Sequence, residues 1–342
     1  MRALMLDGIR SFRSVDLPEP ALPSGGVLIR PTAVALCGSD LMGYLGTHPR
    51  IRPPTVLGHE ALGVVESIDD GVVGLEVGDR VAIDPTSGCG TCRLCRVGRS
   101  NICPEYRVMG EHVDHPGAMA GLLAVPAGQC HVLPDDLPDR LAAIVQPMAV
   151  SYHAAIHRAR IEPGETVVVI GAGAIGLGVL AAARLAGAEV IIADVVPSRL
   201  ERAERMGAVV TVDPRHDDLT AIVRDRTEGH GAEVVLETAG GADDRLLLQA
   251  VESCSPGGRV VVVGLKVPEG RIPVKDLKFH EKTVMGSQAH PNTFPEVIAH
   301  LAAGRIDVTD LVTHELPLDE VQRALELLAD RDPSVLKVVL EH

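Results

Sequence analysis

Four cysteines lie within a stretch of fifteen residues, in a loop rich in glycine and arginine, as Cys89-x2-Cys92-x2-Cys95-x7-Cys103. Four thiolates at this spacing can close around one tetrahedral Zn²⁺ ion. Because four protein ligands leave no coordination position open, the pattern predicts a structural site. An iron–sulfur cluster and unliganded thiols are the alternatives that the same pattern allows.

A second set of candidate metal ligands is dispersed along the chain. Cys37 opens the segment Cys-Gly-Ser-Asp (37–40), and His59 and Glu60 follow Gly58. One thiolate, one imidazole and one carboxylate are the ligand types of a catalytic zinc, which keeps a position open for water or substrate. By spacing alone, a buried cysteine and a lone histidine fit a structural role equally well.

A glycine-spaced loop follows the β-branched run 167–170, in the order Gly171-Ala172-Gly173-Ala174-Ile175-Gly176. An Ala/Leu-rich helical segment comes next and ends near Gly187. In such a strand–turn–helix unit, Gly171 permits the turn, Gly173 lets the backbone approach a pyrophosphate, and Gly176 lets the helix pack on the strand. The helix N-terminus, with Ala174 and Ile175, then offers N–H groups to the phosphates. The pattern predicts dinucleotide binding, and a coincidental glycine-rich turn is the alternative.

Asp194 ends the next apolar run, 190–193, eighteen positions after Gly176. A carboxylate at this place binds the adenosine ribose hydroxyls and would repel a 2′-phosphate, so we expect NAD and not NADP. Arg199 is a candidate to stack on the adenine; its alternative role is on a solvated helix face.

Composition narrows the class of protein. A chain of 342 residues has room for two domains, and 46% hydrophobic with 23% charged residues is typical of a globular protein. The net charge of −14 and the lack of a basic cluster argue against nucleic-acid binding. The uncharged run 167–183 approaches the length of a membrane span, but its spaced glycines favour a buried βα unit. The apolar stretch at the N-terminus is too short for a signal peptide, so we expect a cytoplasmic protein without membrane contact.

The texture of the sequence changes near Ser151. Up to about residue 145, short apolar runs alternate with Pro and Gly, which predicts an all-β domain that is barrel-like and has few helices. From Ser151, buried runs alternate with helical segments, which predicts a doubly wound parallel sheet. We expect helices at 154–160, 199–206, 218–227, 243–253, 294–303 and 318–329, and strands at 189–193, 209–212, 233–237, 259–264 and 336–340.

These motifs together resemble the zinc-dependent medium-chain alcohol/polyol dehydrogenases, the family of sorbitol and threonine dehydrogenases. The matching features run nearly end to end: Cys-Gly-Ser-Asp (37–40), Gly-His-Glu-x-x-Gly (58–63), Val-Gly-Asp-Arg-Val (77–81), the four-cysteine lobe, Gln-Pro-Met-Ala-Val (146–150), Gly-Ala-Gly-Ala-Ile-Gly (171–176), Pro-Gly-Gly-Arg-Val (256–260) and Lys-Val-Val-Leu (337–340). Several independent motifs in one order make chance agreement negligible.

The resemblance implies an α/β protein with two domains. A GroES-like β-barrel catalytic domain would comprise 1–150 and 286–342 and carry the structural zinc lobe at 89–103. A Rossmann NAD-binding domain would comprise 151–285. The resemblance also implies a homodimer or homotetramer.

The resemblance assigns roles residue by residue. Cys37, His59 and Glu60 match the ligands of the catalytic zinc, and Ser39 matches the hydroxyl that relays a proton from the alcohol. Lys337 falls where a basic residue reaches the cofactor pyrophosphate; a surface lysine is the alternative.

Four positions depart from the family pattern. Gln146 stands where polyol dehydrogenases usually carry Glu, near the zinc or its water, and Met42 stands where a relay His is common. His48 and Tyr44 are candidates to replace that His. The segment 117–122 replaces Gly-Gly-Phe-Ala-Glu-Tyr and changes the pocket wall, and Asp69 replaces a small residue in a turn.

The predicted function is oxidation of a secondary alcohol to a ketone, with hydride transfer to NAD and two Zn²⁺ ions per chain. The substrate would be a small molecule: a polyol, sugar acid, cyclitol or small diol. Glu111, His112 and His290 are polar candidates for the mouth of the pocket. A catalytically silent NAD-binding or regulatory homologue of the same fold is the alternative, and it rests on Gln146 and Met42.

Overall fold

The computed structural model describes residues 1–240, 245–264 and 269–342. These residues form two compact units. Unit 1 comprises Met1–Gln146, Phe294–Ala303 and Val312–His342, and unit 2 comprises Pro147–Thr293 and Gly304–Leu311. The domain boundaries expected from the sequence, 150/151 and 285/286, stay a prediction; the compact units change over at 146/147 and assign 304–311 to unit 2.

Unit 1 is built on β-sheets. Its largest sheet has the order β10-β6-β5-β3-β18-β17, with β9 also paired to β3, and smaller sheets have the orders β2-β1-β4 and β7-β8. The strands are β1 (Arg2–Gly8), β2 (Ser11–Asp16), β3 (Gly26–Ala35), β4 (Thr55–Val56), β5 (Glu60–Ile68), β6 (Arg80–Ile83), β7 (Thr86–Ser87), β8 (Arg107–Val108), β9 (Leu123–Pro126), β10 (Cys130–Val132), β17 (Val312–Pro317) and β18 (Lys337–Glu341). Their inward side chains form an aliphatic core.

The helices of unit 1 are short and lie between these strands. They are α1 (Gly38–Tyr44), α2 (Arg93–Arg96), α3 (Asp139–Ala142), α10 (Phe294–Ala302) and α11 (Val321–Ala329), with 3₁₀ turns at Ser100–Ile102, Ala127–Gln129 and Leu318–Glu320. The helix α1 follows β3 directly and packs against α11. Cys37 therefore lies between the end of the buried strand β3 and the start of α1.

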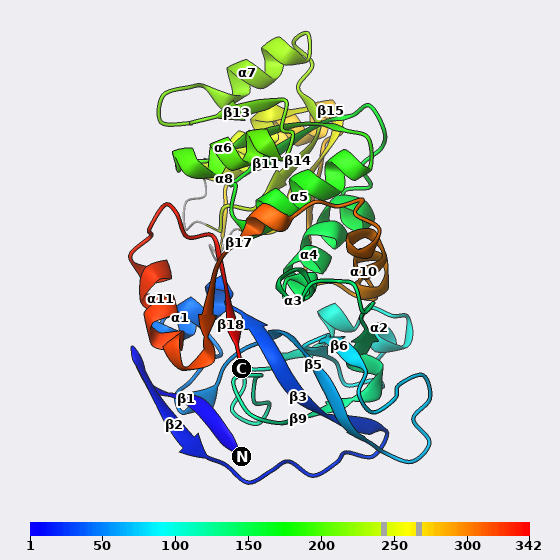
Figure 1. Cartoon of the computed structure of the whole chain (residues 1–342). Coiled ribbons are helices and arrows are strands. Elements are labelled where there is room, and N and C mark those ends of the chain that lie inside the picture. The colour runs from blue at the N-terminus through cyan, green and yellow to red at the C-terminus, as the bar shows by residue number, and fades with distance from the viewer. Residues whose placement is uncertain (241–244, 265–268) are drawn as a thin grey trace. The chain divides into compact units, whose positions relative to one another are not determined.

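The C-terminal strand β18 lies beside β3, although almost the whole chain separates them. Val339 pairs with Ala35 and Glu341 with Ala33 in antiparallel register, and β17 pairs with β18 in parallel. Figure 1 shows the red β18 alongside the blue β3. The pairing brings residue 337 to the segment that ends at Cys37.

Unit 2 contains a six-stranded, fully parallel sheet in the order β13-β12-β11-β14-β15-β16. The strands are β11 (Thr166–Ile170), β12 (Glu189–Ala193), β13 (Val210–Val212), β14 (Ala232–Glu237), β15 (Cys254–Val262) and β16 (Thr283–Gly286). The order reverses beside β11, as in doubly wound nucleotide-binding folds. Val167, Val168 and Val169 are fully buried, because helices cover both faces of the sheet. The predicted fold class is confirmed.

The helices of unit 2 alternate with its strands. They are α4 (Val145–Tyr152), which begins two residues before the unit, α5 (Ala174–Leu185), α6 (Pro197–Arg205), α7 (Leu219–Arg226), α8 (Arg245–Ser253) and α9 (Val274–His280), with a π-helix at His153–Arg158 and a 3₁₀ turn at Thr309–Leu311. Local chemistry sets their starts: Pro197 occupies the first turn of α6, and the Asp218 side chain accepts the N–H of Ala221 at α7.

Two predicted elements differ most from the structure in their bounds, and most of the others differ by one to three residues. The helix expected at 154–160 begins at Val145, because Pro147 suits a first helical turn and does not end a helix; its later part is the π-helix. The strand expected at 259–264 spans Cys254–Val262 and so includes Pro256, Gly257 and Gly258. The predicted start of the helix at 243–244 lies outside the described residues.

The uncharged run 167–183 is divided between β11 and α5, as predicted. Among the described residues, none of the helices has both the length and the apolar character needed to cross a bilayer.

The tight packing of β11 on α5 yields a prediction at Gly176. A Cβ atom there would lie 1.8 Å from the carbonyl oxygen of Gly171 and 2.8 Å from Thr238 Oγ1, so the backbone would have to shift. We expect Gly176→Ala to lower the free energy of unfolding by about 1–3 kcal/mol, as overpacking does. Urea unfolding of the purified variant measures the change.

Gly173 provides the matched control. A Cβ atom there would meet nothing within 4 Å, and its φ of −72° suits any residue. Gly173→Ala should cost less than about 1 kcal/mol, as a change at a helix N-cap. Equal stability of wild type and Gly176→Ala would contradict the prediction.

Candidate active site

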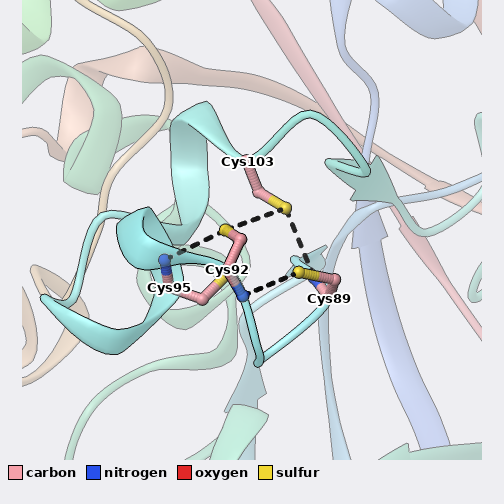
Figure 2. A group of neighbouring side chains, drawn as sticks. All are labelled: Cys89, Cys92, Cys95 and Cys103. Atoms are coloured by element: carbon pink, nitrogen blue, oxygen red, sulfur yellow. Dashed lines mark hydrogen bonds between the residues drawn. The ribbon is translucent and has the colours of Figure 1, made fainter.

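The four cysteines of the lobe converge in the structure, and all seven cysteines are free. The sulfur atoms of Cys89, Cys92, Cys95 and Cys103 lie within 4.8 Å of one another. Figure 2 shows them with backbone N–H groups directed at the sulfurs: Cys92 N lies 3.3 Å from Cys89 Sγ, and Cys95 N lies 3.4 Å from Cys92 Sγ. Such N–H···S hydrogen bonds stabilise thiolates, so the donor set fits a tetrahedral metal ion.

The thiols of this cluster differ in acidity. Hydrogen bonds from the Thr91 hydroxyl and from backbone N–H groups lower the pKa of Cys89 to about 6. Burial raises the pKa of Cys95 to about 12. A bound cation would supply the positive charge that releases the Cys95 proton, because metal binding and thiol deprotonation are linked.

The three dispersed candidate ligands also converge. Donor atoms of Cys37, His59 and Glu60 lie within 4.8 Å of one another. Cys37 is the N-cap of α1, and Glu60 begins β5, where it pairs with Ala35 at the end of β3. His59 is 5% exposed and Glu60 1% exposed, whereas Cys37 is half-buried.

Polar groups lie on both sides of the His59 ring. Its Nδ1 lies 3.7 Å from Asp40 Oδ1, and its Nε2 lies 3.5 Å from Ser39 Oγ. The Cys37 backbone N–H donates to Asp40 Oδ2 at 2.9 Å, which orients that carboxylate. Burial alone would lower the pKa of His59, but the charges of Asp40 and Cys37 outweigh it and raise that pKa well above its ordinary value. A buried site that attracts a proton this strongly is suited to a cation.

Lys337 completes the cluster from the C-terminal strand. Its Nζ is buried and donates to Glu60 Oε1 at 2.8 Å, to Glu60 Oε2 at 2.7 Å and to the Leu36 carbonyl at 3.0 Å. Burial lowers the pKa of Lys337, but the Glu60 charge outweighs it and the pKa is raised. The role of Lys337 at the cofactor pyrophosphate stays a prediction, and its three protons are engaged here within unit 1.

The glycine loop of unit 2 has the geometry of a phosphate cradle. Gly171 has φ +103°, in the region that favours glycine, and a Cβ there would lie 2.7 Å from Ala239 Cα. Gly173 is the N-cap of α5 and has open space beside it. The Thr238 hydroxyl donates to the carbonyls of Ile170 and Gly171 at 3.0 and 2.8 Å and so fixes the turn.

Asp194 follows β12 and fastens this loop. Its Oδ2 accepts the N–H of Ala172 at 2.7 Å, and its Oδ1 accepts the N–H of Val196 at 2.8 Å. Arg199 Nη1 lies 3.8 Å from Asp194 Oδ2. Each carboxylate oxygen keeps acceptor capacity for a ribose hydroxyl, since an oxygen has two lone pairs.

Gln146, Met42 and Tyr44 are further positions that the sequence analysis singled out near the zinc site. Gln146 is half-buried at the second residue of α4, and none of the hydrogen bonds described for the chain joins it to the ligand cluster, so its role stays a prediction. Met42 lies in α1, one turn after Ser39. Tyr44 is fully buried and its hydroxyl donates to Glu326 at 3.2 Å, which engages it on α11.

The polar candidates for the pocket mouth lie in different places. His290 is fully buried in unit 2, and His112 Nδ1 lies 3.3 Å from the Val108 carbonyl. Glu111 is buried and carries an ion pair with Arg50, close to His48. Sequence reasoning missed Arg50, because neither of the two arginines between Pro49 and Pro53 belongs to a motif that marks it.

The segment 117–122 lies against the residues that precede His59. The N–H of Ala118 donates to the Gly58 carbonyl at 2.8 Å, and the N–H of Met119 donates to the Leu57 carbonyl at 3.1 Å. Asp69 accepts the N–H of Gly25 at 2.7 Å and so ties two turns together.

Two family models match the chain. The alcohol dehydrogenase GroES-like domain matches residues 23–135, and the zinc-binding dehydrogenase model matches residues 174–303. The first covers both groups of candidate metal ligands, and the second begins inside the glycine loop.

Similar proteins cover almost the full length. Sorbitol dehydrogenase of Bacillus subtilis is 34% identical over 99% of this chain and 97% of its own, and L-galactonate-5-dehydrogenase of Escherichia coli is 34% identical over 96% and 95%. The solved structure of alcohol dehydrogenase TADH from Thermus sp. ATN1 superposes with a TM-score of 0.92 at 32% identity, covering 100% of this chain and 99% of that one. With both domain models and full-length relatives in agreement, the chain belongs to the zinc-type medium-chain alcohol/polyol dehydrogenase family.

Proposed function

We propose that the protein is a zinc- and NAD-dependent dehydrogenase that oxidises a secondary alcohol to a ketone. The observation that carries the proposal is the convergence of half-buried Cys37 with buried His59 and Glu60, with the Ser39 hydroxyl beside His59. The substrate classes that we propose are polyols, sugar acids, cyclitols and small diols. The names of the sorbitol and galactonate dehydrogenases among the relatives support this range.

The residues of the site have separate tasks in this reaction. Zn²⁺ held by Cys37, His59 and Glu60 supplies Lewis acidity, which lowers the pKa of an alcohol hydroxyl. Ser39 accepts the hydroxyl proton and passes it toward solvent. Asp40 faces His59 Nδ1 and would orient the neutral imidazole by accepting its N–H, and Lys337 offsets the negative charge of Glu60. Gln146 would hydrogen-bond the water or substrate at the open position.

The nucleotide would bind at the glycine loop of unit 2. NAD supplies the acceptor of the hydride that leaves the alcohol carbon. The backbone of Gly171, Gly173 and Gly176 leaves space for the pyrophosphate, and α5 directs its N–H groups there. Asp194 would bind the ribose hydroxyls, and its charge favours NAD over NADP.

The four-cysteine lobe would hold a second, structural zinc. Cys89, Cys92, Cys95 and Cys103 supply four ligands and leave no position for substrate. We further propose a cytoplasmic homodimer or homotetramer that acts on a small molecule, with neither nucleic acid nor membrane as a partner; the family resemblance supports the assembly.

Metal content gives the first test. We expect about two zinc ions per chain by elemental analysis, one for each cluster. Cys103→Ser should lose one zinc and lower the melting temperature by several degrees, because a structural zinc contributes folding free energy. Cys37→Ser should lose one zinc and the activity with a smaller change in melting temperature. Cys130→Ser, outside both clusters, is the control and should keep both ions. Iron in place of zinc, or zinc in one cluster only, would contradict the assignment.

The proton relay gives the second test. With a panel of polyols, sugar acids, cyclitols and diols, NADH absorbance measures turnover. Ser39→Ala should lower kcat by about 10²- to 10⁴-fold, the range for loss of a positioned proton acceptor. Ser39→Thr keeps a hydroxyl and should retain most of the rate. A wild-type rate in Ser39→Ala would refute the relay, and zinc-loaded protein that binds NADH without any turnover would favour the catalytically silent homologue.

Cofactor choice gives the third test. Wild-type protein should prefer NAD⁺ over NADP⁺ in kcat/KM, and Asp194→Asn should narrow that preference about tenfold, since the repelling charge is removed while one acceptor oxygen stays. Asp225→Asn, an exposed change on α7, is the control. A wild-type preference for NADP⁺ would overturn the role of Asp194.

A further inference from the structure

A buried carboxylate that the proposed reaction does not use lies at Glu111. Its side chain is 7% exposed, and both the Nε and the Nη2 of Arg50 donate to its Oε2, the former at 2.9 Å. Burying a carboxylate costs several kcal/mol unless it is paired and hydrogen-bonded. A buried carboxylate is therefore expected mainly where its charge has a structural or functional role.

Glu111 belongs to a small group among the ion pairs described for this chain. The carboxylates in these pairs with side chains under a tenth exposed are Glu60, Asp40, Asp194 and Glu111. The first three lie at the candidate zinc site and at the nucleotide loop. Ordinary surface pairs, such as Arg107 with Asp114, have both partners about half exposed or more. Glu111 thus shares the character of the functional carboxylates.

His48 supports Glu111 from the other side. Its Nδ1 accepts the backbone N–H of Arg50 at 3.3 Å and that of Ile51 at 3.1 Å. An accepting Nδ1 places the ring proton on Nε2, which faces Glu111 Oε1 at 3.8 Å. The carboxylate therefore accepts hydrogen bonds from Arg50 and has the Nε2 of His48 facing its other oxygen.

Arg50 is anchored along one edge only. Its Nη1 makes no hydrogen bond to any residue that the structure describes, and 43% of the side chain is exposed. A guanidinium fixed by a buried carboxylate keeps its charge and geometry while its remaining N–H groups point to solvent. This arrangement suits the recognition of a second oxyanion, because the planar N–H groups match two oxygens.

Both halves of the ion pair are attached to the candidate zinc site. Glu111 follows Gly110, and a Cβ on Gly110 would lie 3.0 Å from the backbone N of Gly58, the residue before His59. The backbones at 110 and 58 are therefore in contact, and the segment that carries Glu111 lies beside the segment that carries His59.

The loop that carries Arg50 is attached to the same site through α1. The N–H groups of Thr47 and His48 donate to the Met42 carbonyl at 2.8 and 3.2 Å. Met42 lies one helical turn after Ser39. The loop is therefore fixed to the helix that carries the proton acceptor of the proposed reaction.

We propose that Arg50 binds an anionic group of the substrate, with Glu111 and His48 as its positioning residues. The inference rests on the proposed function and narrows it: the substrate is a polyhydroxy compound with a carboxylate or a phosphate, and not a neutral polyol. Carboxylate and phosphate present the same paired oxygens to a guanidinium, so the shared chemistry is an oxyanion at some distance from the reacting hydroxyl.

Matched substrates test the proposal. Six-carbon aldonates, the hexitols of the same configuration and the hexitol phosphates are each assayed with NAD⁺ and zinc-loaded wild-type protein. We expect kcat/KM for at least one anionic series to exceed that of the neutral hexitols by about 10-fold or more, the contribution of hydrogen bonds to a charged group. The aldonate and phosphate arms show which oxyanion is used.

Substitutions then assign the effect to Arg50. Arg50→Gln should lower the ratio of kcat/KM for the anionic over the neutral substrate by about 10- to 100-fold, mainly through KM for the anion. Glu111→Gln should lower the same ratio by less, because Arg50 stays but loses its anchor. Arg107→Gln, which removes an exposed arginine of unit 1, is the control and should leave the ratio unchanged. Melting temperatures exclude unfolding as the cause.

A binding measurement separates this proposal from the proposed function. Titration calorimetry of the preferred aldonate or hexitol phosphate into zinc-loaded protein with NADH should give at least tenfold weaker binding for Arg50→Gln than for wild type. Equal binding, or a substrate ratio that Arg50→Gln does not change, would overturn the role of Arg50 while leaving the dehydrogenase intact. Anion binding through Arg50 without oxidation of any panel member would keep this inference and overturn the proposed function.

Discussion

The ion pair of Lys337 with Glu60 is the interaction on which the candidate active site depends. Both side chains are buried, and the lysine donates to both carboxylate oxygens. A buried charge without its partner costs several kcal/mol, so the pair forms only when β18 is in register beside β3. In the same sheet β3 ends at Ala35, two residues before Cys37, and Ala35 pairs with Glu60. The sheet that closes the fold therefore also assembles the ligands.

Charge balance explains the other residues of the cluster. Burial would lower the pKa of His59, but the negative charges of Asp40 and Cys37 beside it raise that pKa. Lys337 offsets the negative charge of Glu60. The remaining negative charge of the cluster is suited to a divalent cation. The proposed reaction needs these charged groups in the interior of the protein. Their mutual pairing lowers the free-energy cost of burying them.

Much of the fold could be predicted from local pattern. The buried valines 167–169, the glycine loop and Asp194 follow one another along the chain, so sequence order and spatial order coincide there. The bounds of α4 and β15 were harder to predict, because a proline is found in turns as well as near the start of a helix or strand. Pro147 lies near the start of α4, and Pro256 lies near the start of β15. The four-cysteine lobe also lies within one short segment, which is why its spacing alone predicted a cluster.

The sequence by itself determined the kinds of ligand, the phosphate loop and the order of the motifs, because each is written in residues that are neighbours along the chain. Only the tertiary structure decided which distant residues meet. It brought Lys337 to Glu60 across 277 positions and Arg50 to Glu111 across 61. No local pattern marks such pairs, since strand register and loop packing, which depend on the whole core, set the distance between them.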